Sequence, residues 1–203
     1  MTTSTMQPQA ADTRSARRAM IDSQLRTSGV NEEYVLARMI SVERERYLPA
    51  EKAALAYIDR SVALPGGGHL AAPLFYGKVL TEADPSSDDR VLVMTNGSDY
   101  LADLVRPLVA RVDTMTVDRA KDASFGPDDS YSLILIDGAI EQLPAKFADA
   151  LEGNGRIVSG LVLRQVTRLA SGRKIAGTLA LQPVEDLGIP VLNAFDKPKS
   201  WTF

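Results

Sequence analysis

The sequence predicts an α/β fold built on a parallel sheet, and the features that indicate it lie in one stretch of the chain. Val91–Met94 is an apolar run without polar alternation, which is typical of a strand buried on both faces. A turn-forming segment, Thr95–Asp99, follows at once, and apolar residues then recur at helical spacing over Tyr100–Ala110. A second strand over Val112–Val117 completes the unit, which ends at Asp118.

A strand-turn-helix-strand unit of this kind commonly binds a nucleotide-like ligand. Backbone N–H groups of the turn approach the ligand, and a carboxylate about 20 residues further on accepts ribose hydroxyls. The candidate ligand-binding residues are therefore Thr95, Asn96, Gly97, Ser98 and Asp118. Gly97 stands alone where such turns place several glycines, and Asp99 brings negative charge to the start of the helix. A ligand-binding turn and a tight turn capped by Asp99 both remain open.

Length and composition suit a single domain with a substantial core. The chain has 203 residues and a net charge of -3 from 23 basic and 26 acidic residues, which gives no electrostatic reason to expect nucleic acid. It contains no cysteine, which excludes disulfides and thiolate metal sites and fits a reducing cytoplasm. No apolar run reaches the roughly 18 residues of a membrane span. We expect a cytoplasmic protein that binds no nucleic acid, membrane or metal.

Residues 13–80 are predicted to form a helical region followed by one loop. Residues 1–12 lack the apolar core of a signal peptide, and we expect them to be a disordered tail. Helical spacing then indicates a helix that Gly29 stops, a second helix that Asn31 caps, and a third, short helix. The charge run Glu43–Arg46 is interpreted as a solvated helix end.

Several segments of the sequence follow the pattern of a known family. MIDSQLRTSGV, VLARMISVERERYLP and ALAYIDRSVALPGGGHLAAP cover most of residues 20–73, and DDSYSLILIDGAIEQLPAKFADALEGNGRIV covers residues 128–158. They resemble the protein-L-isoaspartate O-methyltransferase family, with Val91–Asp118 where that family binds S-adenosylmethionine. The resemblance implies a class I S-adenosylmethionine-dependent methyltransferase fold. Its Rossmann-like sheet would span residues 81–203 and form one structural unit with the N-terminal helical extension.

The loop that carries the family's active site differs in this chain. Members have a serine, one further residue and a proline at the end of this loop, and the serine is a principal active-site group. Here the loop reads Gly68-His69-Leu70-Ala71-Ala72-Pro73, so Ala71 stands at the serine position and its methyl group cannot hydrogen-bond. No catalytic residue of the family is retained by this comparison. His69, the one histidine, is a candidate base or ligand, or else a loop residue without chemistry. The glycines Gly66–Gly68 are interpreted as a source of loop flexibility.

A second difference is the short interval before the next strand. In the complete methyltransferase fold this interval holds a helix, a third strand and a returning connection, and the loop after that strand helps to enclose adenine. The segment Arg119–Ser130 is too short for this, because each parallel crossover needs about a dozen residues. We expect the third strand and its helix to be missing. Val112–Val117 would then be an edge strand, and the adenine side would be open or rebuilt from other residues.

The remaining chain is predicted to complete the sheet. A buried strand over Leu133–Ile136 ends at Asp137, which is a further candidate ligand contact or a turn residue. Ser171–Gly172 is interpreted as a hairpin turn and Ile175–Leu181 as the returning antiparallel strand, which matches the antiparallel end of the methyltransferase sheet. The tail Pro190–Phe203, which ends Trp201-Thr202-Phe203, is interpreted as an irregular arm whose aromatic residues pack on the core or dock on a partner.

Two functions from different classes follow. Because two of three turn glycines, the loop serine and the third strand are lost, we expect a non-catalytic or strongly impaired homologue whose binding of S-adenosylmethionine is doubtful. It would act by binding a protein or a second copy of itself, with the open edge at Val112–Val117 as one docking surface. The alternative is an active S-adenosylmethionine-dependent carboxyl methyltransferase acting on isoaspartyl residues of proteins. In that case Asp118 would hold the ribose and Thr95–Ser98 would face the methionine moiety.

Overall fold

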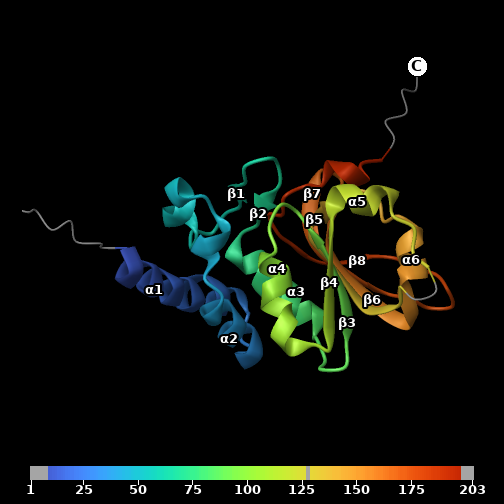
Figure 1. The fold of residues 1–203 in the computed structure, drawn as a ribbon, viewed down its shortest axis with the longest axis horizontal. Coiled ribbons are helices and arrows are strands. Elements are labelled where there is room, and N and C mark those ends of the chain that lie inside the picture. Colours follow the sequence, from blue (N-terminus) through green and yellow to red (C-terminus); the bar gives the residue numbers. More distant parts are fainter. Residues whose placement is uncertain (1–8, 127–128, 198–203) are drawn as a thin grey trace, which may run out of the picture.

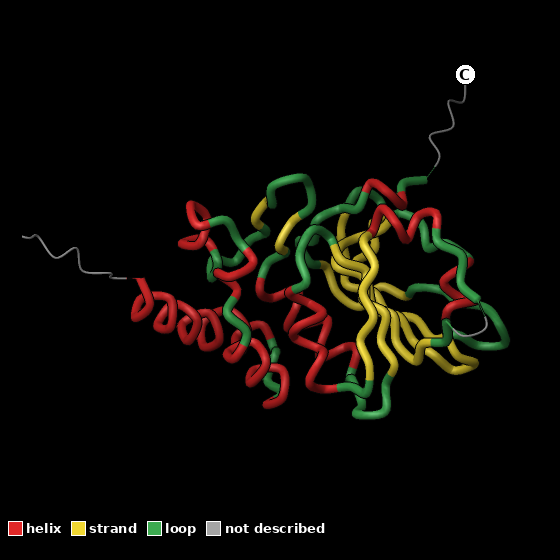
Figure 2. Tube along the Cα trace, in the orientation of Figure 1, coloured by secondary structure: helices red, strands yellow, loops and turns green. Residues whose placement is uncertain are grey.

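Within residues 9–126 and 129–197, which the computed structural model describes, the protein forms a mixed six-stranded sheet beside a helical N-terminal region (Figures 1 and 2). The strand order is β4-β3-β5-β6-β7-β8. The strands are β3 (Arg90–Thr95), β4 (Arg111–Thr116), β5 (Tyr131–Ile140), β6 (Leu151–Leu163), β7 (Val166–Arg173) and β8 (Gln182–Asp186). β3 to β6 run parallel, and β7 and β8 are antiparallel to their neighbours. The predicted α/β fold with an antiparallel end is confirmed.

Two hydrophobic cores cover the two faces of the sheet. Val91 and Val93 pack in the core that contains the N-terminal region, α3 and α4, whereas Leu92 and Met94 pack in the core that contains α5 and α6. The strand is therefore buried on both faces, as its unbroken apolar run predicted. The helices are α1 (Gln9–Met20), α2 (Glu33–Ser41), α3 (Pro73–Ala83), α4 (Tyr100–Val105), α5 (Val117–Asp122) and α6 (Lys146–Ala150).

The N-terminal region keeps the predicted order of helices but not all of their ends. α1 begins at Gln9, inside the segment predicted to be a disordered tail, and continues through a π turn and a 3-10 turn to Gly29. Gly29 has φ 84°, the left-handed conformation that ends a helix at a glycine, as predicted. Asn31 is not the cap of α2, because the helix begins after Glu32. The third helix is a 3-10 segment over Ala50–Leu55.

β4 lies at the edge of the sheet, since β3 is its one neighbour in the described part of the chain. After β4 the chain forms α5, and the rest of the described residues up to 130 form no strand. At the other edge, the predicted hairpin turn is misplaced. Arg164 and Gln165, with φ 51° and 67°, make the turn between β6 and β7, whereas Ser171–Gly172 lies inside β7. Ile175–Leu181 is not the returning strand, because β8 takes that place.

A partly buried ion pair ties the middle of β6 to the residue before β3. The Arg156 guanidinium donates to both carboxylate oxygens of Asp89, at 3.1 and 2.6 Å, and to the backbone oxygens of Ala83 and Asp84. Burial by itself raises the pKa of Asp89, but the bonds from Arg156 and Ser132 outweigh it and hold that pKa below its usual value. The pair fixes the end of α3 to the edge from which the sheet's parallel strands begin.

Candidate functional site

A small hairpin rests directly on the turn after β3. Its strands β1 (Val62–Ala63) and β2 (His69–Leu70) are antiparallel, and the His69 N–H donates to the backbone oxygen of Asn96 at 3.1 Å. A Cβ on Gly68 would lie 2.4 Å from the same oxygen, and a Cβ on Gly97 would lie 3.0 Å from the Gly67 oxygen. Gly68 and Gly97 also have φ of 82° and 85°. These glycines are required by the close contact between the two backbones, which corrects the interpretation of the glycine loop as merely flexible.

A pocket of about 390 Å³ lies where this hairpin meets the carboxyl ends of β3 and β4. It is lined by Gly66–His69, Thr95–Gly97, Thr116–Asp118 and Val191–Ala194. Its volume falls within the range of about 300–1,000 Å³ that small-molecule sites occupy. The carboxyl edge of parallel strands is also where such sheets bind ligands.

The pocket brings together five of the eight residues that the sequence singled out. Thr95, Asn96, Gly97, Asp118 and His69 line it, whereas Ser98, Ala71 and Asp137 do not. Asp118 lies on α5, in its first turn, because β4 ends at Thr116 and not at Val117. The Ser98 hydroxyl accepts a hydrogen bond from the Tyr100 N–H at 3.1 Å.

Ser98 also lines a more open neighbouring pocket with Tyr47 and Asp103. Asp99 precedes α4 but makes no side-chain cap hydrogen bond, so it does not cap the helix through its carboxylate.

Beneath the hairpin lies a buried arginine that the sequence analysis misinterpreted. Arg44 belongs to the charge run expected to be a solvated helix end, yet it is 0% exposed. Its guanidinium donates to the backbone oxygens of Ala56 and Ala71, at 2.7 and 2.8 Å. It also lies over the rings of Tyr76 and Tyr100, with 5.3 and 4.9 Å to the ring centroids. Arg44 thus joins the N-terminal region to the loop at the family serine position.

Tyr76 and Asp137 hold the same loop residue from the other side. The Tyr76 hydroxyl accepts a hydrogen bond from the Ala71 N–H at 3.0 Å and donates to Asp137 Oδ2 at 3.2 Å. Burial raises the pKa of Asp137 to about 7, which outweighs the lowering by the Tyr76 bond and the Arg44 charge. Burial likewise raises the pKa of Tyr76 well above its usual value, so its hydroxyl keeps its proton. Both backbone groups of Ala71 are therefore bonded to buried side chains.

Asp137 is not at the exposed strand end where the sequence placed it. It is 1% exposed and lies inside β5, which continues to Ile140. Between Leu135 and Ala139 the register of β5 against β6 shifts, because four residue steps on β5 match two on β6, from Val158 to Gly160. This bulge sets Asp137 into the core beside Tyr76. It is neither a turn residue nor a residue that lines the pocket.

In the described ranges 9–126 and 129–197, no helix is long and apolar enough to cross a membrane. No group of three or more metal-ligand side chains comes together there either.

Comparison with known proteins agrees with this arrangement. The sequence model of the family described as protein-L-isoaspartate(D-aspartate) O-methyltransferase matches residues 15–125. The chain belongs to this family. A protein-L-isoaspartate O-methyltransferase from Methanoculleus marisnigri is 25% identical, over 90% of this chain and 94% of its own. One from Koribacter versatilis is 28% identical, over 84% of this chain and 87% of its own.

The solved structures show the same fold. A Plasmodium falciparum structure described as a protein-L-isoaspartate O-methyltransferase in complex with S-adenosyl-L-homocysteine has a TM-score of 0.70. It is 16% identical and covers 90% of this chain and 98% of its own. The predicted family is thus confirmed. Relatives that carry the name of an enzyme favour the alternative function over the non-catalytic one that we expected.

We expect the free energy of unfolding of this protein to depend on pH through the ionisation of Asp137. Because the pKa of this carboxyl rises from 3.8 to about 7 on folding, the native state binds more protons than the unfolded state between these values. Its contribution to stability is therefore fully present below about pH 4 and is lost as the pH rises to about 7, on the order of 3–4 kcal/mol. Asp137→Asn should remove this loss, as measured by urea unfolding at pH 4 to 8.

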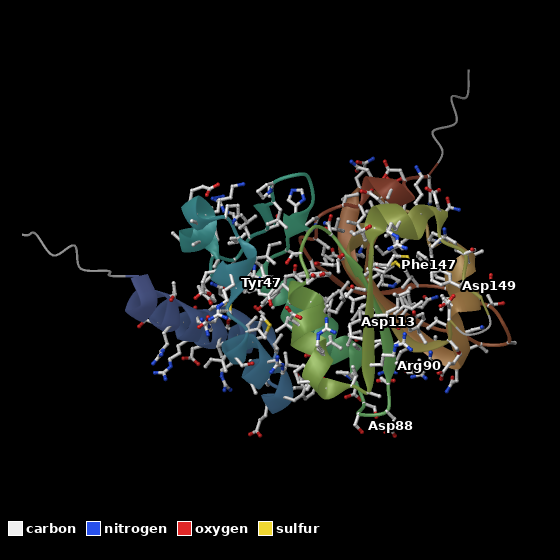
Figure 3. The ribbon with its side chains drawn as sticks, in the orientation of Figure 1. Tyr47, Asp88, Arg90, Asp113, Phe147 and Asp149 are labelled. Atoms are coloured by element: carbon white, nitrogen blue, oxygen red, sulfur yellow. The ribbon has the colours of Figure 1, made fainter. Side chains whose placement is uncertain are left out.

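The control for that experiment is Asp149→Asn, on the exposed side of α6 (Figure 3). It should keep the pH profile of the unchanged protein. Parallel profiles for the unchanged protein and Asp137→Asn would contradict the burial of an ionisable Asp137.

The charge run contains a matched control for Arg44, because Arg46 lies two residues further on and is exposed. Arg44→Ala leaves the carbonyl oxygens of Ala56 and Ala71 buried without their donor, so it should lower the free energy of unfolding by about 2–5 kcal/mol. Arg46→Ala removes a side chain that is 77% exposed and should cost no more than about 0.5 kcal/mol. Equal losses in urea unfolding would show that Arg44 is not the buried member of the run.

Proposed function

We propose that the protein is an S-adenosylmethionine-dependent carboxyl methyltransferase that acts on isoaspartyl residues of proteins. The observation that carries this proposal is the pocket between the glycine hairpin and the turn after β3, at the ligand-binding edge of the sheet. Family membership supports it, as do relatives named for this activity and a neighbouring structure described in complex with the demethylated cofactor.

The residues of the pocket fit this cofactor. A Cβ on Gly66 or Gly67 would meet nothing within 4 Å, so this side of the pocket is open main chain. Such bare backbone lets the methionine end approach the hairpin and the turn at Asn96 and Gly97. Asp118 lines the same pocket and is exposed, so its carboxylate can accept hydrogen bonds from the two ribose hydroxyls.

The rate of this reaction depends mainly on how the protein positions the two reactants. When bound, S-adenosylmethionine supplies an electrophilic methyl group, which a carboxylate oxygen of the substrate takes as the carbon–sulfur bond breaks. That carboxylate is already ionised near neutral pH, so this chain needs no general base. Ala71 at the serine position therefore removes one hydrogen-bonding hydroxyl and no proton acceptor. Arg44 and Tyr76 still fix the backbone of Ala71 through the bonds to its O and N atoms.

A second function stays in view because of one observation. The side chain of Ala71 is 1% exposed and lies in the hydrophobic core, so it presents no polar group to a substrate. A protein that binds the cofactor without turnover, and acts by binding a protein partner or a second copy, would tolerate this residue. The edge strand β4 then offers unpaired backbone groups for such a partner.

Binding and transfer separate the two functions. In calorimetric titration, S-adenosylmethionine and S-adenosylhomocysteine should bind with a dissociation constant in the micromolar range, about 8 kcal/mol in free energy. A peptide with one isoaspartyl residue should then be methylated, and the same peptide with ordinary aspartate should not. No heat and no thermal stabilisation at millimolar ligand would exclude the methyltransferase. Binding without transfer to any isoaspartyl peptide would favour the second function.

A variant at the family serine position tests whether the side chain of residue 71 contributes to turnover. Because the side chain at position 71 is 1% exposed and does not line the pocket, a hydroxyl there cannot reach the substrate, so Ala71→Ser should not raise kcat for the isoaspartyl peptide. The dissociation constant of S-adenosylhomocysteine should not change. Ala72→Ser, which places a hydroxyl on the next residue of the loop, should leave kcat as it is. A rise in kcat of about three- to tenfold for Ala71→Ser, the value of one hydrogen bond to the substrate, would contradict the burial of position 71.

A further inference from the structure

We propose that the C-terminal segment Val191–Ala194 forms the wall that holds the nucleoside end of the cofactor, with Val191 as the residue that contacts the base. This inference rests on the proposed function and names the residues that serve it. The sequence predicted that this side of the pocket is open or rebuilt from other residues. No residue of 119–126 or 129–130 lines the pocket, whereas all four residues of Val191–Ala194 do.

The segment is fixed to the sheet before it reaches the pocket. The Thr167 hydroxyl of β7 donates to the Leu187 oxygen at 2.6 Å and accepts from the Ile189 N–H at 3.2 Å. The Leu187 N–H in turn donates to the Thr167 backbone oxygen at 3.1 Å. These three bonds direct the chain from the antiparallel end of the sheet back across its carboxyl edge.

At β5 the segment adds a short stretch of parallel pairing. The Ala139 N–H donates to the Pro190 oxygen, and the Leu192 N–H donates to the Ala139 oxygen, both at 2.8 Å. The Leu192 side chain, 3% exposed, fills the space over Gly138, where a Cβ would lie 2.6 Å from it. Gly138 therefore has no side chain because the C-terminal segment needs that space.

Beyond the pocket the segment is anchored a second time. The 3-10 turn η6 (Asn193–Phe195) lies beside α5 (Figure 1). The ring of Phe195 packs against Phe147 of α6, with 5.8 Å between centroids, and the Gln142 N–H donates to the Phe195 oxygen at 3.1 Å. Held on both sides, Val191–Ala194 is a fixed part of the pocket lining.

The chemistry of this wall suits a nucleoside. Val191 lines the pocket and is 44% exposed, so its apolar surface is left for a ligand to cover. Val117 and Leu192 also line the pocket but are almost buried, so they expose little apolar surface beside that of Val191. Asp118 brings a carboxylate to the same pocket. A purine has apolar faces and a ribose has hydroxyl donors, so the two parts of adenosine match the two parts of this wall.

Two ligands and two variants test the inference. Val191→Glu puts a charge where the base would lie, and Val184→Glu makes the same change at a valine of β8 that is 48% exposed and lines none of the pockets described above. Each protein is titrated calorimetrically with S-adenosylhomocysteine and with 5′-methylthioadenosine, which lacks the amino-acid end. Val191→Glu should weaken both ligands by the same factor, about tenfold or more, and Val184→Glu should leave both unchanged. Thermal unfolding should show both variants folded.

Each of the other outcomes contradicts either the proposed function or the inference about Val191. If the unchanged protein binds neither ligand, the proposed function fails and the inference fails with it. If the unchanged protein binds both and Val191→Glu binds them equally well, the proposed function stands and the base lies elsewhere. If Val191→Glu and Val184→Glu weaken binding to the same extent, the loss reflects charge alone, and Val191 is not the contact.

Discussion

The candidate site depends on a contact between two backbones, the glycine hairpin and the turn after β3. The His69 N–H donates to the Asn96 oxygen, and Gly68 lies so close to that oxygen that any side chain would separate the two segments. Separation would open the pocket, because the hairpin and the turn both line it. A contact of this kind carries no side-chain signal. It shows in the sequence only as glycines.

The other end of the hairpin is held by a buried polar cluster. Arg44 holds the loop at Ala71 through its bonds to two backbone oxygens and its contacts with two ring faces, and its charge lowers the pKa of Asp137 in the same cluster. Asp137, with its pKa raised to about 7, is largely protonated in mildly acidic conditions. The cluster connects the N-terminal region, α3 and β5. Through Arg44 the helical extension contacts the loop at Ala71 and so helps to support the site.

Local patterns predicted the parts of the structure that local patterns control. The run Val91–Met94 showed a strand buried on both faces, and the turn after it placed Thr95, Asn96 and Gly97 in the pocket. The charge run could not show that Arg44 is buried, because a pattern of alternating charges is the same whether the side chains are solvated or buried. Its partners, Ala56, Ala71 and the two tyrosine rings, are at least 12 residues away in sequence.

The sequence misplaced the hairpin turn and did not indicate the pocket wall at Val191–Ala194, and the two reasons are related. Arg164 and Gln165 adopt left-handed φ values that turns usually give to glycine or asparagine, whereas Ser171–Gly172 looks like a turn and lies in β7. Gly172 is instead required because a Cβ there would lie 2.2 Å from the Ala180 oxygen. The wall at Val191–Ala194 is placed by bonds to Thr167 and Ala139, which only the folded sheet brings near.

The most direct test of the account is a crystal structure of the complex with S-adenosylhomocysteine. We expect the ligand in the pocket between the hairpin and the turn after β3, with its amino-acid end at Gly97 and its ribose hydroxyls on Asp118. Ligand density in the neighbouring pocket beside Tyr47 and Ser98, or an empty pocket in crystals grown at saturating ligand, would contradict it.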